Sequence, residues 1–230
     1  MPTTIVPQDF AAQQERAVTI LQILQRATAH YAEPMSITMR QHFGPDPFII
    51  LISCLLSLRA KDSKTLPISM QLFARARTAQ ELLAIPVTEL EQLLYSLGYY
   101  RQKTRIIREV CIQLLQDFGG NVPATREELL RIKHVGRKTA NLVLAVAFGQ
   151  PAICVDVHVH RIANRLGLVV TQTPEQTERA LEKLLPQEWW ATVNELLIKF
   201  GQHICVPISP KCTSCPLVDR CPRIGVTRHR

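Results

Sequence analysis

Long apolar runs and glycine are both scarce in this sequence of 230 residues. The longest apolar run, Pro47 to Leu58, is far shorter than the roughly 20 residues that a transmembrane helix needs. Only nine residues are glycine while 47% are hydrophobic, which argues against a disordered chain. The N-terminal segment MPTTIVPQDF has neither the basic start nor the apolar stretch of a signal peptide. We therefore expect a folded globular protein with an intracellular location.

Alternating strand patterns, internal repeats and low-complexity linkers are also missing from the sequence. Apolar residues instead recur at spacings of three and four, as in TRIIREVCIQLL (104–115), which is typical of amphipathic helices. A threonine followed three residues later by glutamate predicts a helix start at Thr88 and at Thr125, and Gly201 lies where a helix is expected to end. The short run PAICV (151–155) indicates an extended return segment. The predicted fold class is all-α, with about ten short helices.

Negative charge is outnumbered in this chain. The 27 lysines and arginines exceed the 19 aspartates and glutamates, so the formal net charge is +8, and no acidic residue occurs between Glu128 and Asp156. Such an excess points to a polyanionic partner, either nucleic acid or an anionic membrane. A contribution to solubility alone is the alternative explanation.

The segment HVGRKTA (134–140) joins two predicted helices through a tight hairpin with Gly136 at its turn. Glycine lets backbone N–H groups approach an anion closely, and the second helix adds the positive pole of its N-terminus. Four basic residues surround this corner: Arg131, Lys133, Arg137 and Lys138. The corner therefore suits a phosphate, although an ordinary turn with a solvated basic face would have the same composition. A nucleotide-binding P-loop is excluded, because Arg137 occupies the position of an essential glycine.

Lys138 stands where the second helix should begin, although a cation there is disfavoured by about 0.3 to 1 kcal/mol. An amine attacks only when it is neutral, and at pH 7 only about one lysine in 2,500 with an ordinary pKa of about 10.4 is neutral. A carboxylate that accepts the proton would help. Asp156 is a candidate, because the extended segment after the helix is long enough to return the chain along the length of that helix. Asp156 can therefore lie beside Lys138. The alternative role for Asp156 is to cap the helix VHVHRIANRLG.

Four of the seven cysteines crowd into the C-terminal segment: Cys205, Cys212, Cys215 and Cys221. This segment is too short for an apolar core of its own, so the four thiols need a soft metal or a cluster to hold them together. Zinc and a [4Fe-4S] cluster both accept four cysteine ligands, and the spacing leaves both open. The remaining cysteines, Cys54, Cys111 and Cys154, lie in apolar stretches and are expected in the core.

The motifs VGRKTAN and VDVHVHR and the four-cysteine spacing, in this order, resemble the endonuclease III family of DNA repair glycosylases, in the helix-hairpin-helix superfamily. The likeness extends from about Pro47 to Cys221. It implies a monomeric bifunctional enzyme of the cytoplasm or nucleoid. Such an enzyme flips a damaged, typically oxidised, pyrimidine out of double-stranded DNA, cuts its N-glycosidic bond and cleaves the abasic site by β-elimination. The alternatives are a monofunctional mismatch glycosylase and a non-catalytic DNA-binding or redox-sensing protein.

The resemblance also implies roles for individual residues. Lys138 would attack the sugar C1′ and form a Schiff base, Asp156 would assist it, and the four C-terminal cysteines would hold a [4Fe-4S] cluster, with zinc as the alternative. Eight residues are expected to contact DNA: Arg59, Lys133, His134, Val135, Gly136, Arg137, Thr139 and His158. Two helical domains are expected to flank a DNA-binding cleft. Residues 39–150 would form the domain that carries the helix-hairpin-helix, and residues 1–38 with 151–230 would form the domain with the cluster loop.

Two positions depart from the family pattern. The hairpin has Ile-Lys-His-Val-Gly where the family commonly has Leu-Pro-Gly-Val-Gly, so His134 replaces a glycine. We expect His134 either to tolerate a left-handed turn or to add a phosphate contact. Arg59, in LLSLRAKD, stands where the best-known members carry a glutamine that fills the gap left by the flipped base. Arginine can stack and donate up to about five hydrogen bonds, so we expect an altered preference for the opposite base. A phosphate contact or a solvated side chain are the alternatives for Arg59.

Overall fold

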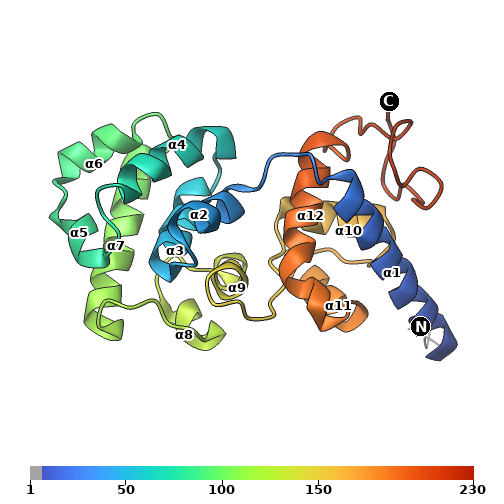
Figure 1. The fold of residues 1–230 in the computed structure, drawn as a ribbon, viewed down its shortest axis with the longest axis horizontal. Coiled ribbons are helices and arrows are strands. Elements are labelled where there is room, and N and C mark those ends of the chain that lie inside the picture. Colours follow the sequence, from blue (N-terminus) through green and yellow to red (C-terminus); the bar gives the residue numbers. More distant parts are fainter. Residues whose placement is uncertain (1–6) are drawn as a thin grey trace. The chain divides into compact units, whose positions relative to one another are not determined.

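The computed structural model describes residues 7–230, and this part of the chain contains twelve α-helices, one short 3-10 helix and no β-strand. The predicted all-α fold class is confirmed. The helices form two compact units (Figure 1). The central unit is Pro34–Ala152, and the terminal unit combines the segment that ends at Glu33 with Ile153–Arg230.

The central unit holds eight helices in chain order: α2 (Met35–Phe43), α3 (Pro47–Ser57), α4 (Asp62–Phe73), α5 (Ala79–Ala84), α6 (Val87–Leu94), α7 (Tyr100–Phe118), α8 (Arg126–Arg131) and α9 (Arg137–Val146). Helix α3 lies at its centre and packs against α2, α4, α7 and α9. Asp46 starts α3, because its side chain accepts hydrogen bonds from the N–H groups of Phe48 at 2.9 Å and Ile49 at 3.2 Å. A helix that is apolar on all sides belongs in a core. No helix in residues 7–230 is long and apolar enough to cross a membrane.

The terminal unit holds α1 (Pro7–Ala27), α10 (Val157–Arg165), α11 (Pro174–Leu184), the 3-10 helix η1 (Gln187–Trp189) and α12 (Trp190–His203). Helix α12 packs against α1 and α10, and α11 packs against the same two helices. A capping box at Thr173 and Gln176, followed by Pro174 at the first helical position, explains where α11 begins. The chain after α12 contains no regular element and carries the four clustered cysteines.

Two local predictions are wrong. Thr88 does not start a helix, because α6 already begins at Val87 after Pro86. Gly201 does not end one, because it lies inside α12. A Cβ atom at Gly201 would come within 2.6 Å of His158 Nδ1, so this glycine serves a close approach between α12 and α10 rather than a helix end. The predicted start at Thr125 is confirmed, since its Oγ1 accepts a hydrogen bond from the N–H of Glu128 at 3.3 Å.

Candidate active site

Helices α8 and α9 form the predicted hairpin in the central unit. Between them the N–H of Val135 donates to the carbonyl of Ile132 at 3.1 Å. His134 adopts a φ of 65°, which confirms the predicted left-handed turn. Gly136 is the N-cap of α9 without any side-chain cap, and a Cβ atom there would meet nothing within 4 Å. The backbone at the start of α9 is therefore open to approach, as an anion site at a helix N-terminus requires.

Helix α7 braces this turn from the side. The side chain of Gln113 donates to the carbonyl of Arg131 at 3.1 Å and accepts from the N–H of Lys133 at 2.8 Å. The Nε2 atom of His134 lies 2.7 Å from Oε2 of Glu109. This hydrogen bond from His134 is the main reason why the pKa of Glu109 lies below its usual range. The imidazole that replaces the family's glycine is therefore engaged with α7.

Lys138 is the second residue of α9 and is half-buried. Its neighbour Thr139 is only 3% exposed, and the Thr139 hydroxyl lies 3.6 Å from the Cys54 thiol of α3, which donates to it. Packing of α9 against α3 thus fixes the helix that carries Lys138. Because the side chains of Thr139 and Val135 are buried, a DNA contact from either residue can come only from its backbone. Lys133, His134 and Gly136 are exposed, and Arg137 is half-buried.

Arg59 lies exposed in the turn that follows α3 and has a φ of 55°. Left-handed backbone is uncommon for a residue other than glycine and marks a place worth a functional explanation. Arg59 and the hairpin both belong to the central unit.

Asp156 lies in the terminal unit, immediately before α10. Its Oδ1 atom accepts hydrogen bonds from the N–H groups of His158 at 2.8 Å and Val159 at 2.9 Å, so the predicted N-cap role is confirmed. The segment ahead of it has no regular secondary structure, and the side chain of Asn194 on α12 donates to the carbonyl of Cys154 at 2.9 Å. Asp156 and the half-buried His158 are therefore placed by contacts within the terminal unit, whereas Lys138 belongs to the central unit.

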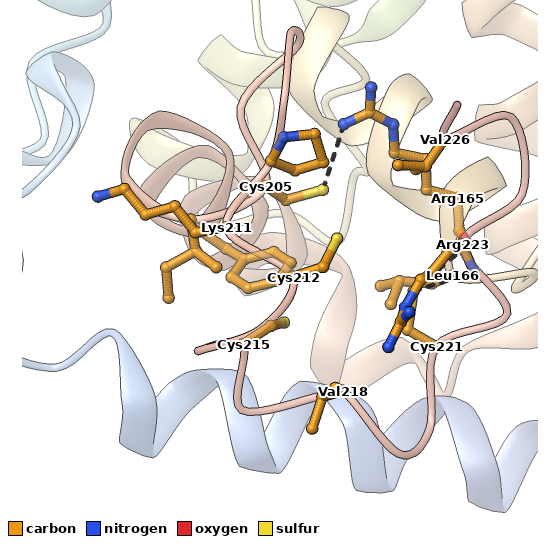
Figure 2. A pocket seen from close by; sticks show the side chains of 13 residues that line it. Arg165, Leu166, Cys205, Lys211, Cys212, Cys215, Val218, Cys221, Arg223 and Val226 are labelled. Atoms are coloured by element: carbon orange, nitrogen blue, oxygen red, sulfur yellow. Dashed lines mark hydrogen bonds between the residues drawn. The ribbon is translucent and has the colours of Figure 1, made fainter. Parts of the chain in front are cut away.

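The four C-terminal cysteines line one pocket of the terminal unit (Figure 2). Backbone N–H groups donate to two of their sulfur atoms, from Leu217 to Cys215 and from Arg223 to Cys221, each at 3.4 Å. The guanidinium of Arg165 donates to the Cys205 sulfur at 3.6 Å. Donors directed at sulfur stabilise thiolates, the form in which cysteine binds a metal.

Two of the thiols in this pocket, Cys215 and Cys221, are partly buried. Burial raises the pKa of Cys215 and of Cys221, against the lowering effect of their backbone hydrogen bonds. Within residues 7–230 no three cysteine, histidine or acidic side chains are grouped so that they could hold a single metal ion. Zinc would require all four sulfurs at about 2.3 Å from one point. A four-iron cluster binds each cysteine through a different iron, and the four thiols that line this pocket have the donor chemistry that it needs.

The other three cysteines are buried, as predicted. Burial raises the pKa of the Cys111 thiol to about 12. A thiol of this kind stays protonated at neutral pH and does not serve as a ligand.

Comparison with known proteins identifies the family. The family model of the HhH-GPD superfamily base excision DNA repair proteins matches residues 52–187. Endonuclease III of Thermotoga maritima is 48% identical over 182 residues, which cover 79% of this chain and 85% of that protein. The chain belongs to the endonuclease III family of the HhH-GPD superfamily. The predicted activity class is confirmed with the family: this is a base excision repair enzyme, a DNA glycosylase with AP lyase activity.

Solved structures of the family have the same fold. A non-covalent endonuclease III–DNA complex is 35% identical with a TM-score of 0.81, and the match covers 91% of this chain and 95% of that one. A trapped endonuclease III–DNA covalent intermediate is 34% identical with a TM-score of 0.79, and here the match covers 91% and 96%.

Proposed function

We propose that this endonuclease III family enzyme removes oxidised pyrimidines from double-stranded DNA with Lys138 as its nucleophile. The Nζ atom of Lys138 attacks C1′ of the damaged nucleotide, the N-glycosidic bond breaks, and the base leaves. The resulting Schiff base permits β-elimination, which opens the strand at the 3′ side of the sugar. The position of Lys138 carries this proposal, because it follows directly on the hairpin turn and sits on a helix anchored in the core. A related endonuclease III has been trapped as a covalent intermediate with DNA, which supports a covalent mechanism here.

The hairpin supplies the phosphate contacts in this proposal. The N–H groups at the start of α9 and the side chains of Lys133 and Arg137 would hold the backbone of the damaged strand. Contacts of this kind help to offset the few kcal/mol that expelling a base from the duplex costs. They also bring the sugar toward Lys138. This explains why a lysine stands at an otherwise unfavourable helix position.

Asp156 would assist Lys138 as a carboxylate that takes up and returns a proton. This role is compatible with its N-cap role, because both capping hydrogen bonds are accepted by Oδ1. His158 would contact the same strand from the first turn of α10. In this proposal the central unit would supply the nucleophile and the terminal unit the carboxylate.

Borohydride trapping on duplex DNA that contains an oxidised pyrimidine tests the role of Lys138. The wild-type protein should form a covalent adduct and cleave the strand, whereas Lys138→Gln should do neither. The matched control is Lys183→Gln, which removes an exposed lysine of α11 and should leave the adduct unchanged. Base release without an adduct in the wild-type protein would identify a monofunctional glycosylase. Binding without base release would identify a non-catalytic DNA-binding protein.

We further propose that Cys205, Cys212, Cys215 and Cys221 hold a [4Fe-4S] cluster. When bound, the cluster would cross-link a segment that has no regular secondary structure, a structural role. Visible absorbance and iron content test the assignment. Both should be lost in Cys212→Ser and retained in Cys111→Ala, which removes a buried thiol of the central unit. Stoichiometric zinc in place of iron would contradict the cluster.

A further inference from the structure

Lys103, in the first turn of α7, is only 5% exposed. Its ammonium group donates hydrogen bonds to the carbonyl oxygens of Leu56 at 2.8 Å and Leu58 at 2.6 Å. These carbonyls lie at the C-terminal end of α3, where a helix leaves its last carbonyls without partners of its own and presents its negative pole. A cation from α7 therefore caps α3.

Neighbouring carbonyls at this helix end are satisfied locally. The Ser57 hydroxyl donates to the carbonyl of Cys54 at 2.9 Å, and the N–H of Ala60 donates to the carbonyl of Ser57 at 3.0 Å. The carbonyls of Leu56 and Leu58 instead receive the side chain of a residue on another helix. Burial lowers the pKa of Lys103, and the two carbonyl oxygens that accept its hydrogen bonds oppose this effect on the charged form.

Two strained turns meet at Lys103. Arg59, directly after Leu58, has a φ of 55°, and Tyr99, the N-cap of α7, has a φ of 61° and is 66% exposed. Left-handed residues other than glycine persist only where surrounding contacts hold them. The backbone N–H of Lys103 donates to the carbonyl of Tyr99 at 2.9 Å as the first backbone bond of α7, while its side chain donates to the carbonyls of Leu56 and Leu58. One residue thus joins both turns.

We propose that Lys103 is a positioning residue. Its side chain connects the turn at Arg59, after α3, to the turn at Tyr99, before α7, and so holds Arg59 in a fixed geometry for contact with DNA. The functional half of this inference rests on the proposed DNA contact of Arg59. Lysine suits the task because its ammonium has three donors that can reach two carbonyls at once. Methionine has a similar length and no donor, so Lys103→Met removes the tie while it fills the space.

Hydrogen exchange measured by mass spectrometry tests whether Lys103 connects the two turns, independently of any activity. In Lys103→Met, amide exchange in peptides that cover residues 55–62 and 97–103 should rise on the order of tenfold, because the carbonyls of Leu56 and Leu58 lose the donor that joins the end of α3 to the start of α7. The control is Lys199→Met, which removes the other buried lysine, 4% exposed and paired with Glu33 and Glu195 in the terminal unit. It should leave both peptides unchanged. No change in Lys103→Met, or an even rise over the whole central unit, would overturn the proposal.

A double-mutant cycle with Arg59→Ala tests the functional half. Single-turnover excision from lesion-containing duplex should fall about tenfold in Lys103→Met, but less than about twofold when the change is made in Arg59→Ala, since coupled residues are not additive. Equal losses in both backgrounds would show that Lys103 does not act through Arg59. Lys103→Gln, which keeps an N–H donor, should show an intermediate loss and takes the place of Lys103→Met if that variant does not fold. Absence of excision by the wild-type protein would reject the proposed function. The exchange experiment would still show whether Lys103 connects the two turns.

Discussion

His134 occupies a backbone conformation that costs a residue with a Cβ atom about 1 to 2 kcal/mol. Its imidazole contacts Glu109, so the side chain partly offsets a strain that a glycine would not have. This explains how the hairpin tolerates the departure from the family pattern. It also favours the turn explanation of His134 over a phosphate contact, because the ring is engaged with α7.

We predict that His134→Gly is at least as stable as the wild-type protein. Relief of the left-handed strain should contribute about 1 to 2 kcal/mol, against the loss of one exposed contact and about 0.4 to 1 kcal/mol from the greater freedom of glycine in the unfolded chain. Thermal unfolding measures the difference, and His134→Ala, which keeps the strain and loses the contact, is the control and should be less stable than both. A clear loss of DNA affinity in a stable His134→Gly variant would instead assign the imidazole a phosphate contact.

The same variant should change how Glu109 titrates. The hydrogen bond from His134 lowers the pKa of Glu109, so its stabilising effect is present above the usual glutamate pKa and is lost as the pH falls through the lowered value. In His134→Gly the pKa of Glu109 should rise toward its usual range. A carboxyl-detected NMR titration checks this, and an unchanged midpoint would show that other charges control Glu109.

At the scale of elements, the start of α10 combines a structural and a proposed catalytic role in Asp156. Asparagine accepts the same capping hydrogen bonds as aspartate, whereas alanine accepts none. We predict that Asp156→Asn keeps the wild-type free energy of unfolding and loses base excision, while Asp156→Ala loses about 1 kcal/mol of stability as well. Denaturant unfolding and single-turnover excision measured on both variants separate the two roles. Full excision by Asp156→Asn would leave Asp156 with its capping role alone.

The contact between α10 and α12 depends on the missing side chain of Gly201. A Cβ atom there would lie 2.6 Å from His158 Nδ1 and 2.8 Å from Ile162 Cδ1. We predict that Gly201→Ala destabilises the protein by about 1 to 3 kcal/mol, although alanine has the higher helix propensity. Denaturant unfolding measures the loss. The control is Ala191→Gly, on the exposed side of the same helix, where propensity acts without a packing clash and the cost should not exceed about 1 kcal/mol. An increase in stability of Gly201→Ala would show that α12 can shift away from α10.

For the whole molecule, the net charge of +8 predicts DNA binding that weakens with salt. Each phosphate contact should contribute about 0.9 to the slope of log K against log salt concentration. We predict that Arg137→Ala lowers this slope by about one unit, because Arg137 is proposed to contact a phosphate. Arg75→Ala, which removes the same charge at a position paired with Glu89, is the control and should leave the slope unchanged. A slope near zero in the wild-type protein would contradict binding through the DNA backbone.

Local signals in the sequence were sufficient for the helical class, the hairpin, the cap at Asp156 and the four-cysteine segment. These features depend on residues a few positions apart, such as Thr125 with Glu128 or Asp156 with Val159, so composition and spacing determine them. The family motifs are local in the same sense, which is why the resemblance already indicated the repair activity.

Tertiary structure decided the features that join distant parts of the chain. Lys103 caps a helix whose Leu56 lies 47 residues away, and Glu109 lies 25 residues from the His134 that it contacts. Gly201 is of the residue type expected at a helix end, but it lies inside α12. Glycine is needed there because α10 packs too closely for a side chain. Contacts of this kind follow from which helix faces meet, and no periodicity within one segment encodes its partner. The sequence by itself therefore determined which reactive and ligating residues the protein contains. The packing of helices determined which contacts position them.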